Sequence, residues 1–343
     1  MIVTTADHAI HDPEAYTLEG DARRYWEVPA RAERLLDAMR AYGLTVRPVA
    51  QDGDLAPIAR VHDKDYLSFL ETAFHRWQEL PGAPPILRAP AYAVRYPARL
   101  PKGVAGQAGW YLSAVSSPLV AGTWQAALGS AQAAIAAADI VLGGARQAYA
   151  LCRPPGHHAH TDMAAGFCYL NNAAIAAQRM LDAGSGKVAI LDFDVHHGNG
   201  TQQIFYERDD VHYVSVHGDP AWLYPWFAGY ADETGQGAGL GWNLNLPLPP
   251  GTGNEGFTAA VARGLDAIAA KSPAALIISV GFDAQQGDPA ANLAVDAQGF
   301  AAVGRRIGAL GLPTLLVQEG GYLVERLGAN LTAFLEGLDI PRG

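Results

Sequence analysis

The chain has 343 residues, of which 50% are hydrophobic and only 17% are charged, so it can bury a large core and is not a disordered protein. Its 24 basic and 34 acidic side chains give a formal net charge of −10. That charge argues against nucleic acid as the main partner, because a protein that binds a duplex needs a basic face. Two cysteines, Cys152 and Cys168, are too few for a disulfide framework or a four-cysteine zinc site.

The sequence is that expected of a soluble, cytoplasmic enzyme without a membrane span. It begins MIVTTADHAIHDPE, which has no basic region ahead of an apolar stretch and therefore does not resemble a secretory signal. Its longest apolar tract, about 126–145, is interrupted by Ser130, Gln132 and Asp139, which argues against a helix that crosses a bilayer.

Short β-rich apolar runs alternate along the chain with Ala- and Leu-rich stretches. Runs such as AALIISV are apolar on both faces, so this alternation predicts an α/β fold with a parallel sheet covered by helices on both sides. Ligands of such sheets bind beyond the carboxyl ends of the strands. The expected strands are Ile2–Thr5, Ala148–Leu151, Val188–Leu191, His212–Val216, Trp242–Leu246, Leu276–Val280 and Thr314–Gln318, and the expected helices cover 124–141, 171–183, 254–270, 296–310 and 322–336.

One region, about 79–123, departs from this alternation and is rich in Pro, Gly and aromatic residues. An irregular insert of this length is uncommon in a compact domain, and it is usually functional or part of an interface. We therefore expect it to contribute to a binding surface.

Two polar segments follow strands and hold five of the eleven histidines, CRPPGHHAH (152–160) and ILDFDVHHGNGT (190–201). Side chains on a strand alternate, so Asp192, Asp194 and His196 are expected on one side. Two carboxylates and an imidazole at a sheet edge would repel or stay unsatisfied without a cation. Oxygen and nitrogen ligands without thiolate favour zinc or a neighbouring first-row ion.

Two further strand ends complete this prediction. Asp283 follows the strand at Leu276–Val280 and is the expected third ligand, whereas Asp288, between Gly287 and Pro289, is interpreted as a turn residue. The last strand runs into EGGY, where Tyr322 either donates a hydrogen bond to a developing oxyanion or is an aromatic lid on the following helix.

Together, RPPGHHA, GFCYLNNAA, ILDFDVHHGNGT, VSVHGDP, GFDAQQGDP and EGGY resemble the zinc-dependent deacetylases of the arginase–deacetylase fold. That superfamily includes histone deacetylases and acetylpolyamine amidohydrolases, and the 79–123 insert resembles the latter. The resemblance implies a single deacetylase domain over 1–343 with an approximately eight-stranded sheet. It also implies that the insert forms an interface in a homodimer or higher assembly.

The resemblance further implies a role for individual residues. Zinc, or ferrous iron, would be bound by Asp194, His196 and Asp283; His157, His158 and Tyr322 would be catalytic; and Gly166, Phe167 and Tyr224 would line the substrate tunnel. A structural potassium ion would be bound by Asp192, Ser215, Val216 and the backbone of Asp194 and His196. Asp192, Asn199 and Arg31 would support the site, Asp192 beside His157, Asn199 behind His158 and Arg31 beside an acetate-release channel.

The implied reaction is hydrolysis of the acetyl amide of an acetylated primary amine, either an acetylpolyamine or an acetyl-lysine side chain. Family enzymes that act on polyamines carry carboxylates at the tunnel rim, but this chain has no Asp or Glu between Lys102 and Gln125. Glu14, Glu19 or Asp219 are the candidates to replace them. Two alternatives are a non-catalytic protein that binds acetylated ligands and a two-metal, arginase-like enzyme. The second would need another Asp–His pair near Asp283.

Overall fold

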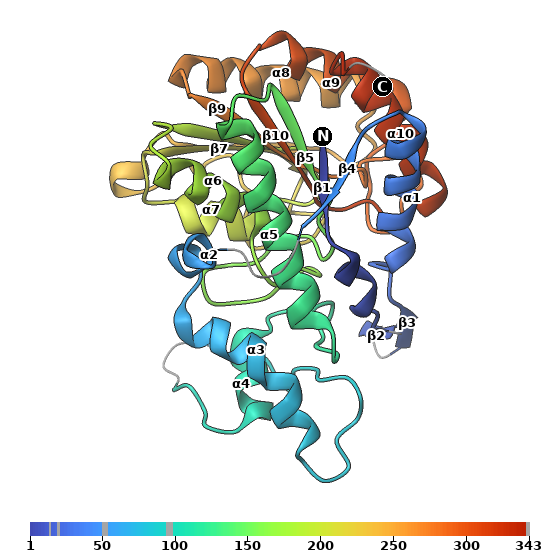
Figure 1. Cartoon of the computed structure of the whole chain (residues 1–343), viewed down its shortest axis with the longest axis vertical. Coiled ribbons are helices and arrows are strands. Elements are labelled where there is room, and N and C mark those ends of the chain that lie inside the picture. Colours follow the sequence, from blue (N-terminus) through green and yellow to red (C-terminus); the bar gives the residue numbers. More distant parts are fainter. Residues whose placement is uncertain (14, 19–20, 50–53, 94–98, 341–343) are drawn as a thin grey trace.

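Eight parallel strands form the central sheet of this computed structural model, which describes residues 1–13, 15–18, 21–49, 54–93 and 99–340. The strand order is β4-β1-β5-β10-β9-β6-β7-β8 (Figure 1). The expected parallel α/β sheet is therefore confirmed, and each expected strand lies within two residues of its observed bounds. The strands are β1 Ile2–Thr4, β4 Val46–Pro48, β5 Gln147–Ala150, β6 Val188–Asp192, β7 Val211–Gly218, β8 Asn243–Leu248, β9 Ala275–Val280 and β10 Thr314–Gln318.

The sheet separates two hydrophobic cores. Along β6, Val188 and Ile190 pack into one core while Ala189 and Leu191 pack into the other, as the two-residue period of a strand requires. Both faces are therefore apolar, which is why these strands read as continuous hydrophobic runs. The first core is covered by α2 Ala56–Val61, α3 Lys64–Gln78, α4 Val104–Tyr111, α5 Thr123–Leu142 and α6 Asn172–Asp182; the second is covered by α1 Pro29–Ala41, α8 Asn254–Lys271, α9 Ala297–Ala309 and α10 Val324–Gly337.

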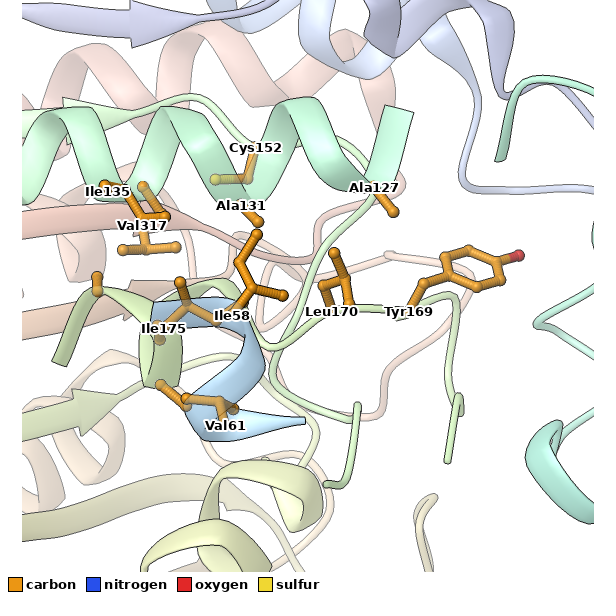
Figure 2. Packing of buried hydrophobic residues seen from close by; sticks show 14 of the residues in the cluster. Ile58, Val61, Ala127, Ala131, Ile135, Cys152, Tyr169, Leu170, Ile175 and Val317 are labelled. Carbon is orange, nitrogen blue, oxygen red and sulfur yellow. The ribbon is translucent and has the colours of Figure 1, made fainter. Parts of the chain in front are cut away.

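Helix α5 is the central helix of the first core. Figure 2 shows Ala127, Ala131 and Ile135 along α5, with Val317 of β10 and Ile175 of α6 in the same cluster. Among the described residues, α5 is the one helix long and apolar enough to cross a membrane, but most of it is buried inside this core. It is the core helix of a soluble protein.

The sequence prediction missed much of the amino-terminal part. Besides α1–α4 it missed edge strand β4, whose Pro48 suits an edge because proline donates no ladder hydrogen bond. The hairpin β2 Ala15–Leu18 with β3 Asp21–Arg24, the short helix α7 Asn199–Phe205, and the 3-10 turns η1 Ala6–Ile10 and η2 Gly237–Gly239 were also missed.

The 79–123 region is more regular than expected. It contains α4 and an antiparallel bridge between Leu87 and Leu119, both buried in the first core. Residues 94–98 lie outside the described residues. Figure 1 shows α3 and α4 at the end of the molecule farthest from α8 and α9. That the 79–123 region forms a dimer interface stays a prediction.

Strand order determines where the polar segments meet. Strands β5, β10, β9, β6 and β7 are consecutive neighbours and all parallel, so the loops after each of them leave the same edge of the sheet. The segments that begin at residues 151, 319, 281, 193 and 219 are thereby gathered at one place.

Candidate active site

Asp194, His196 and Asp283 form a buried cluster at this edge. Each offers one ligand atom, and these atoms all lie within 4.8 Å of one another. His196 Nδ1 is 3.1 Å from Asp194 Oδ1 and 3.3 Å from Asp283 Oδ2. The other ring nitrogen, Nε2, lies 2.9 Å from the carbonyl oxygen of Ala290 and donates its hydrogen there. Nδ1 is therefore the imidazole atom that faces the two carboxylates.

The chemistry of this cluster fits a metal ion. Asp283 Oδ2 is buried and has no hydrogen-bond partner among the described residues, so its charge needs compensation from a cation. Gly320 closes the other side of the cluster: its N–H donates to Asp194 Oδ2 at 2.7 Å, and a Cβ at this position would lie 2.1 Å from Asp283 Oδ2. Only glycine lets the backbone approach the carboxylates this closely.

A second group of potential ligands, His157, Cys168 and Glu319, is satisfied without an ion. Glu319 Oε2 accepts the backbone N–H groups of Gly156 and His157, at 2.6 and 3.1 Å, and its Oε1 accepts the Ser279 hydroxyl. The Cys168 thiol donates to the carbonyl of Gly166. Among the described residues, therefore, there is no second set of ligands that needs a cation, as a two-metal enzyme would require.

His157 and His158 lie side by side next to the cluster, with ring centroids 4.0 Å apart. His157 Nδ1 donates to Asp192 Oδ2 at 3.0 Å, and His158 Nδ1 donates to Asn199 Oδ1 at 2.7 Å. Burial alone would lower the pKa of His157, but the carboxylates of Asp194 and Asp192 outweigh it and raise that pKa to about 10.

The pKa of His158 moves the opposite way and lies well below its usual value. Burial is the main cause, and the neighbouring rings of His157 and His196 add to it. With Nδ1 donating to Asn199, the free atom of the neutral His158 ring is Nε2, which can accept a proton. The two adjacent histidines therefore differ in charge, because carboxylates overcome the effect of burial at His157 but not at His158.

Tyr322 is buried beside Phe167, with ring centroids 5.4 Å apart. Burial raises the pKa of its hydroxyl well above the usual value, although Arg31 opposes this. The phenol therefore keeps its proton and can act as a hydrogen-bond donor. Arg31 donates to the carbonyls of Gly321 and Glu319, at 2.5 and 2.7 Å, and pairs with Glu27. It thus holds the backbone segment that leads to Tyr322.

The residues implied for a substrate tunnel surround His158 and Tyr322. Gly166 has φ +50°, and a Cβ there would lie 2.3 Å from the His158 ring, so a side chain is excluded on both counts. Tyr224 stands edge-on to His158 at 4.9 Å between centroids, and Phe167 contacts Tyr322. These three residues therefore lie around the His158 and Tyr322 rings.

The residues implied for a potassium site lie at the end of β6, on the loop after it and within the neighbouring strand β7. Asp192 and Ser215 are register partners across these strands. Asp192 Oδ1 accepts the Asp194 N–H, and Oδ2 accepts the Tyr213 hydroxyl in addition to His157. The Ser215 hydroxyl lies 2.8 Å from His217 Nδ1. Val216 follows Ser215 on β7, and Asp194 and His196 follow Asp192 on the adjoining loop.

Three buried acids were missed or misread in the sequence. Glu319 was passed over within EGGY, and Glu27, which pairs with both Arg31 and Arg153, lies in a stretch without a motif. Asp288 was interpreted as a turn residue. It does accept the Ala290 N–H as a turn residue would, but it also accepts the N–H groups of Tyr322 and Leu323. No local pattern marks a side chain that bonds backbone from a distant loop.

Asp288 is nearly fully buried, and its surroundings shift its pKa in opposite directions. Burial and the nearby Asp283 carboxylate raise the pKa of Asp288 to about 7, and its three backbone N–H donors oppose this rise.

Comparison with known proteins agrees with this geometry. A model of the histone deacetylase domain matches residues 25–338. The acetylpolyamine amidohydrolase of Burkholderia pseudomallei is 49% identical, with 98% of both chains covered. That of Mycoplana ramosa is 42% identical, with 98% of this chain and 99% of the relative covered. A crystal structure of the Burkholderia pseudomallei acetylpolyamine aminohydrolase superposes with a TM-score of 0.94 at 48% identity and covers 100% of this chain and 99% of that one. The chain therefore belongs to the histone deacetylase family, in which it is an amidohydrolase of the deacetylase type.

Proposed function

We propose that this enzyme hydrolyses the acetyl amide of N-acetylated polyamines to acetate and the free amine. The observation that carries the proposal is the Asp194–His196–Asp283 cluster with His157 and His158 beside it, which unites metal ligands with a proton acceptor. The polyamine assignment draws on relatives at 42% and 49% identity that bear the name acetylpolyamine amidohydrolase.

Zinc is the proposed metal and ferrous iron the alternative, because the cluster offers carboxylate oxygen and imidazole nitrogen without thiolate. When bound, the metal would polarise the acetyl carbonyl and acidify the attacking water. Asp194, His196 and Asp283 would hold it, and the Ala290 carbonyl would keep His196 in the tautomer that leaves Nδ1 free. We also propose a structural potassium ion at Asp192, Ser215, Val216 and the backbone of Asp194 and His196.

His158 is the proposed general base. Its Nε2 would take the proton of the attacking water and later deliver it to the leaving amine nitrogen. Asn199 fixes the ring through Nδ1 at 2.7 Å. His157, held by Asp192, would act through its charge, and Tyr322 would donate a hydrogen bond to the tetrahedral oxyanion. A protein that only binds acetylated ligands would need neither a base nor an oxyanion donor.

Gly166, Phe167 and Tyr224 are the proposed lining of a substrate tunnel, which would admit an unbranched aliphatic amine and exclude bulkier groups. No acidic residue occurs between Lys102 and Gln125, so the cationic end of a polyamine would be met by other groups. Glu14 and Glu19 lie outside the described residues. Asp219, after β7, accepts the backbone N–H of Ala221 and is partly exposed.

We further propose that residues 1–343 form a single deacetylase domain that works in the cytoplasm, and that the 79–123 insert joins two copies in a homodimer. Light scattering of the purified protein tests the assembly. A monomer at micromolar concentration would contradict it.

Turnover of acetylputrescine, acetylspermidine and an acetyl-lysine peptide tests the substrate, with metal-loaded and chelator-treated enzyme measured in parallel. We expect the acetylpolyamines to be cleaved with the highest kcat/KM, and cleavage to stop when the metal is removed. His158→Ala is the control for contaminating activity, because it leaves the proposed metal ligands in place. Preference for the peptide would overturn the polyamine assignment, and no cleavage of any substrate would overturn the deacetylase reaction.

A further inference from the structure

The buried carboxylate of Asp288 joins two loops of the active site. Oδ2 accepts the backbone N–H of Tyr322 at 2.7 Å and that of Leu323 at 2.9 Å. Oδ1 accepts the N–H of Ala290 at 3.0 Å. The side chain is 5% exposed, so water competes little for these bonds.

These bonds hold the start of α10. Leu323, the residue before this helix, makes no side-chain capping hydrogen bond of its own. From a loop 34 residues earlier in the chain, Asp288 instead accepts the N–H groups of the two residues that precede the helix, Tyr322 and Leu323, and a negative charge at a helix N-terminus is stabilised by the helix dipole. Tyr322 follows two glycines, Gly320 and Gly321, which have no side chains to anchor the segment.

The other carboxylate oxygen of Asp288, Oδ1, binds a loop that also packs against Tyr322. Ala290, held by Oδ1, packs against the cluster of Tyr25, Phe167 and Tyr322. We propose that Asp288 is a positioning residue for Tyr322: it fixes the tyrosine backbone against the Ala290 loop, so that the phenol is held where the oxyanion forms. This inference rests on the proposed role of Tyr322 as an oxyanion donor.

Asp288→Asn tests it with little change in shape. The variant keeps one acceptor oxygen, but its amide nitrogen cannot accept an N–H, so one of the two loops is released. We expect kcat for the best acetylated substrate to fall about 10- to 100-fold with KM changed less than about twofold. Unchanged kcat would overturn the proposal.

A double-mutant cycle separates positioning from general damage. In a Tyr322→Phe background the phenol is already gone, so adding Asp288→Asn is expected to lower kcat less than about twofold further. Multiplicative losses would show that Asp288 does not act through Tyr322 and would overturn the proposal. Zinc affinity, measured by chelator competition, is expected to change less than about threefold. A larger loss would instead assign Asp288 to the His196 side of the site through Ala290.

Hydrogen exchange supplies a readout that needs no turnover. In the metal-loaded protein, either the peptide covering 320–324 or the peptide containing Ala290 is expected to exchange faster in Asp288→Asn than in wild type, because the amide nitrogen leaves the N–H groups of one of the two loops without an acceptor. Unchanged exchange would overturn the inference whether or not the enzyme catalyses the proposed reaction. Faster exchange combined with multiplicative losses of kcat in the double-mutant cycle would show that Asp288 holds the backbone of these loops but does not act through Tyr322. That result would also overturn the proposal.

Asp296 provides the matched control. It is exposed and caps α9 by accepting the N–H groups of Gln298 and Gly299, at 2.8 and 3.2 Å, so that, like Asp288, it accepts two consecutive backbone N–H groups, but at α9 instead of at Tyr322. Asp296→Asn is expected to leave kcat unchanged. If it lowers kcat as much as Asp288→Asn does, the loss reflects helix capping in general and the positioning role fails. Asp288→Ser serves as the second variant if Asp288→Asn does not fold.

Discussion

The guanidinium carbon of Arg31 lies 4.8 Å from the centre of the Tyr322 ring, while the same side chain donates to the carbonyls of Gly321 and Glu319. Arg31 belongs to the first turn of α1, nearly three hundred residues away in the sequence. A planar guanidinium can face a ring and donate in several directions at once, which an ammonium cannot. Arg31 therefore connects the amino-terminal helix to the proposed oxyanion donor.

Replacing Arg31 by Met is expected to lower kcat about tenfold or more and to destabilise the fold by about 3 kcal/mol, since a buried charge pair loses one partner. Arg153 remains beside Glu27 and limits the damage. Chemical unfolding and steady-state kinetics measure the two effects. Arg40→Met, an exposed change on the same helix, is the control and is expected to alter stability by less than about 0.5 kcal/mol. Equal effects of the two variants would contradict the role assigned to Arg31.

Replacing Tyr322 by Phe removes only the phenol oxygen. We expect kcat to fall about 100- to 1000-fold, the usual loss for one oxyanion donor, while bound metal per chain stays the same. Metal analysis and kinetics on the same preparation check this. Tyr66→Phe is the comparison and is expected to lower kcat far less, because Tyr66 is also a fully buried tyrosine but belongs to α3 and donates its hydroxyl to the backbone carbonyl of Tyr169. Full activity of Tyr322→Phe would refute its catalytic role.

The parallel sheet and the residues of the metal cluster could be predicted from sequence because the relevant patterns are local. Strands apolar on both faces and the spacing of Asp192, Asp194 and His196 depend only on near neighbours in the chain. The missed helices α1 and α3 also had a local pattern. Their buried residues recur at spacings of three and four, as in Tyr66, Phe69, Leu70 and Ala73 of α3. The strands beside α1 are the short β3 and β4, which the sequence does not predict either, and α3 has a helix on each side, so neither stretch fits the alternation of strands and helices.

The contacts that support the site could not be predicted in this way. Glu319 bonds Gly156 and His157 across more than 160 residues, and Asp288 bonds Tyr322 across 34. Their partners are backbone N–H groups, which every residue except proline carries, so no residue type marks the pairing. Such acids become visible only once the strand order brings their loops together.

Glu319→Gln changes one oxygen to an amide nitrogen at the acid that holds the histidine loop. The glutamine oxygen can still accept from Gly156 and His157, and its amide group can donate to the Ser279 hydroxyl. The acceptor loses its negative charge, however, which weakens the two N–H bonds, so the loop that carries His157 and His158 is expected to loosen. We expect kcat to fall at least about tenfold. Glu325→Gln, an exposed change in the first turn of α10, is the control. Wild-type activity in Glu319→Gln would show that backbone contacts alone hold the loop.

His62 is expected to make the fold sensitive to acid. It is buried in neutral form: Nδ1 donates to the His160 carbonyl, and Nε2 accepts the N–H of Asn171 at the start of α6. Burial lowers its pKa to about 4, against the ordinary 6.5 that the unfolded chain would show. Between these values the unfolded state binds the proton and the folded state does not, so the stabilising contribution is present above about pH 6.5 and is lost as pH falls toward about 4.

The full difference is about 3 kcal/mol, of which about 2 kcal/mol should disappear between about pH 7 and pH 5. Urea unfolding at both pH values measures it. His62→Gln keeps a donor and an acceptor but cannot titrate, so its stability should fall less steeply with acid. Some acid sensitivity will remain, because burial also lowers the pKa of His212 and His217 to about 4. His75→Gln, at a side chain 83% exposed, should leave the profile unchanged. If His62→Gln loses stability with falling pH as steeply as wild type does, protonation of His62 does not account for the loss of stability in acid.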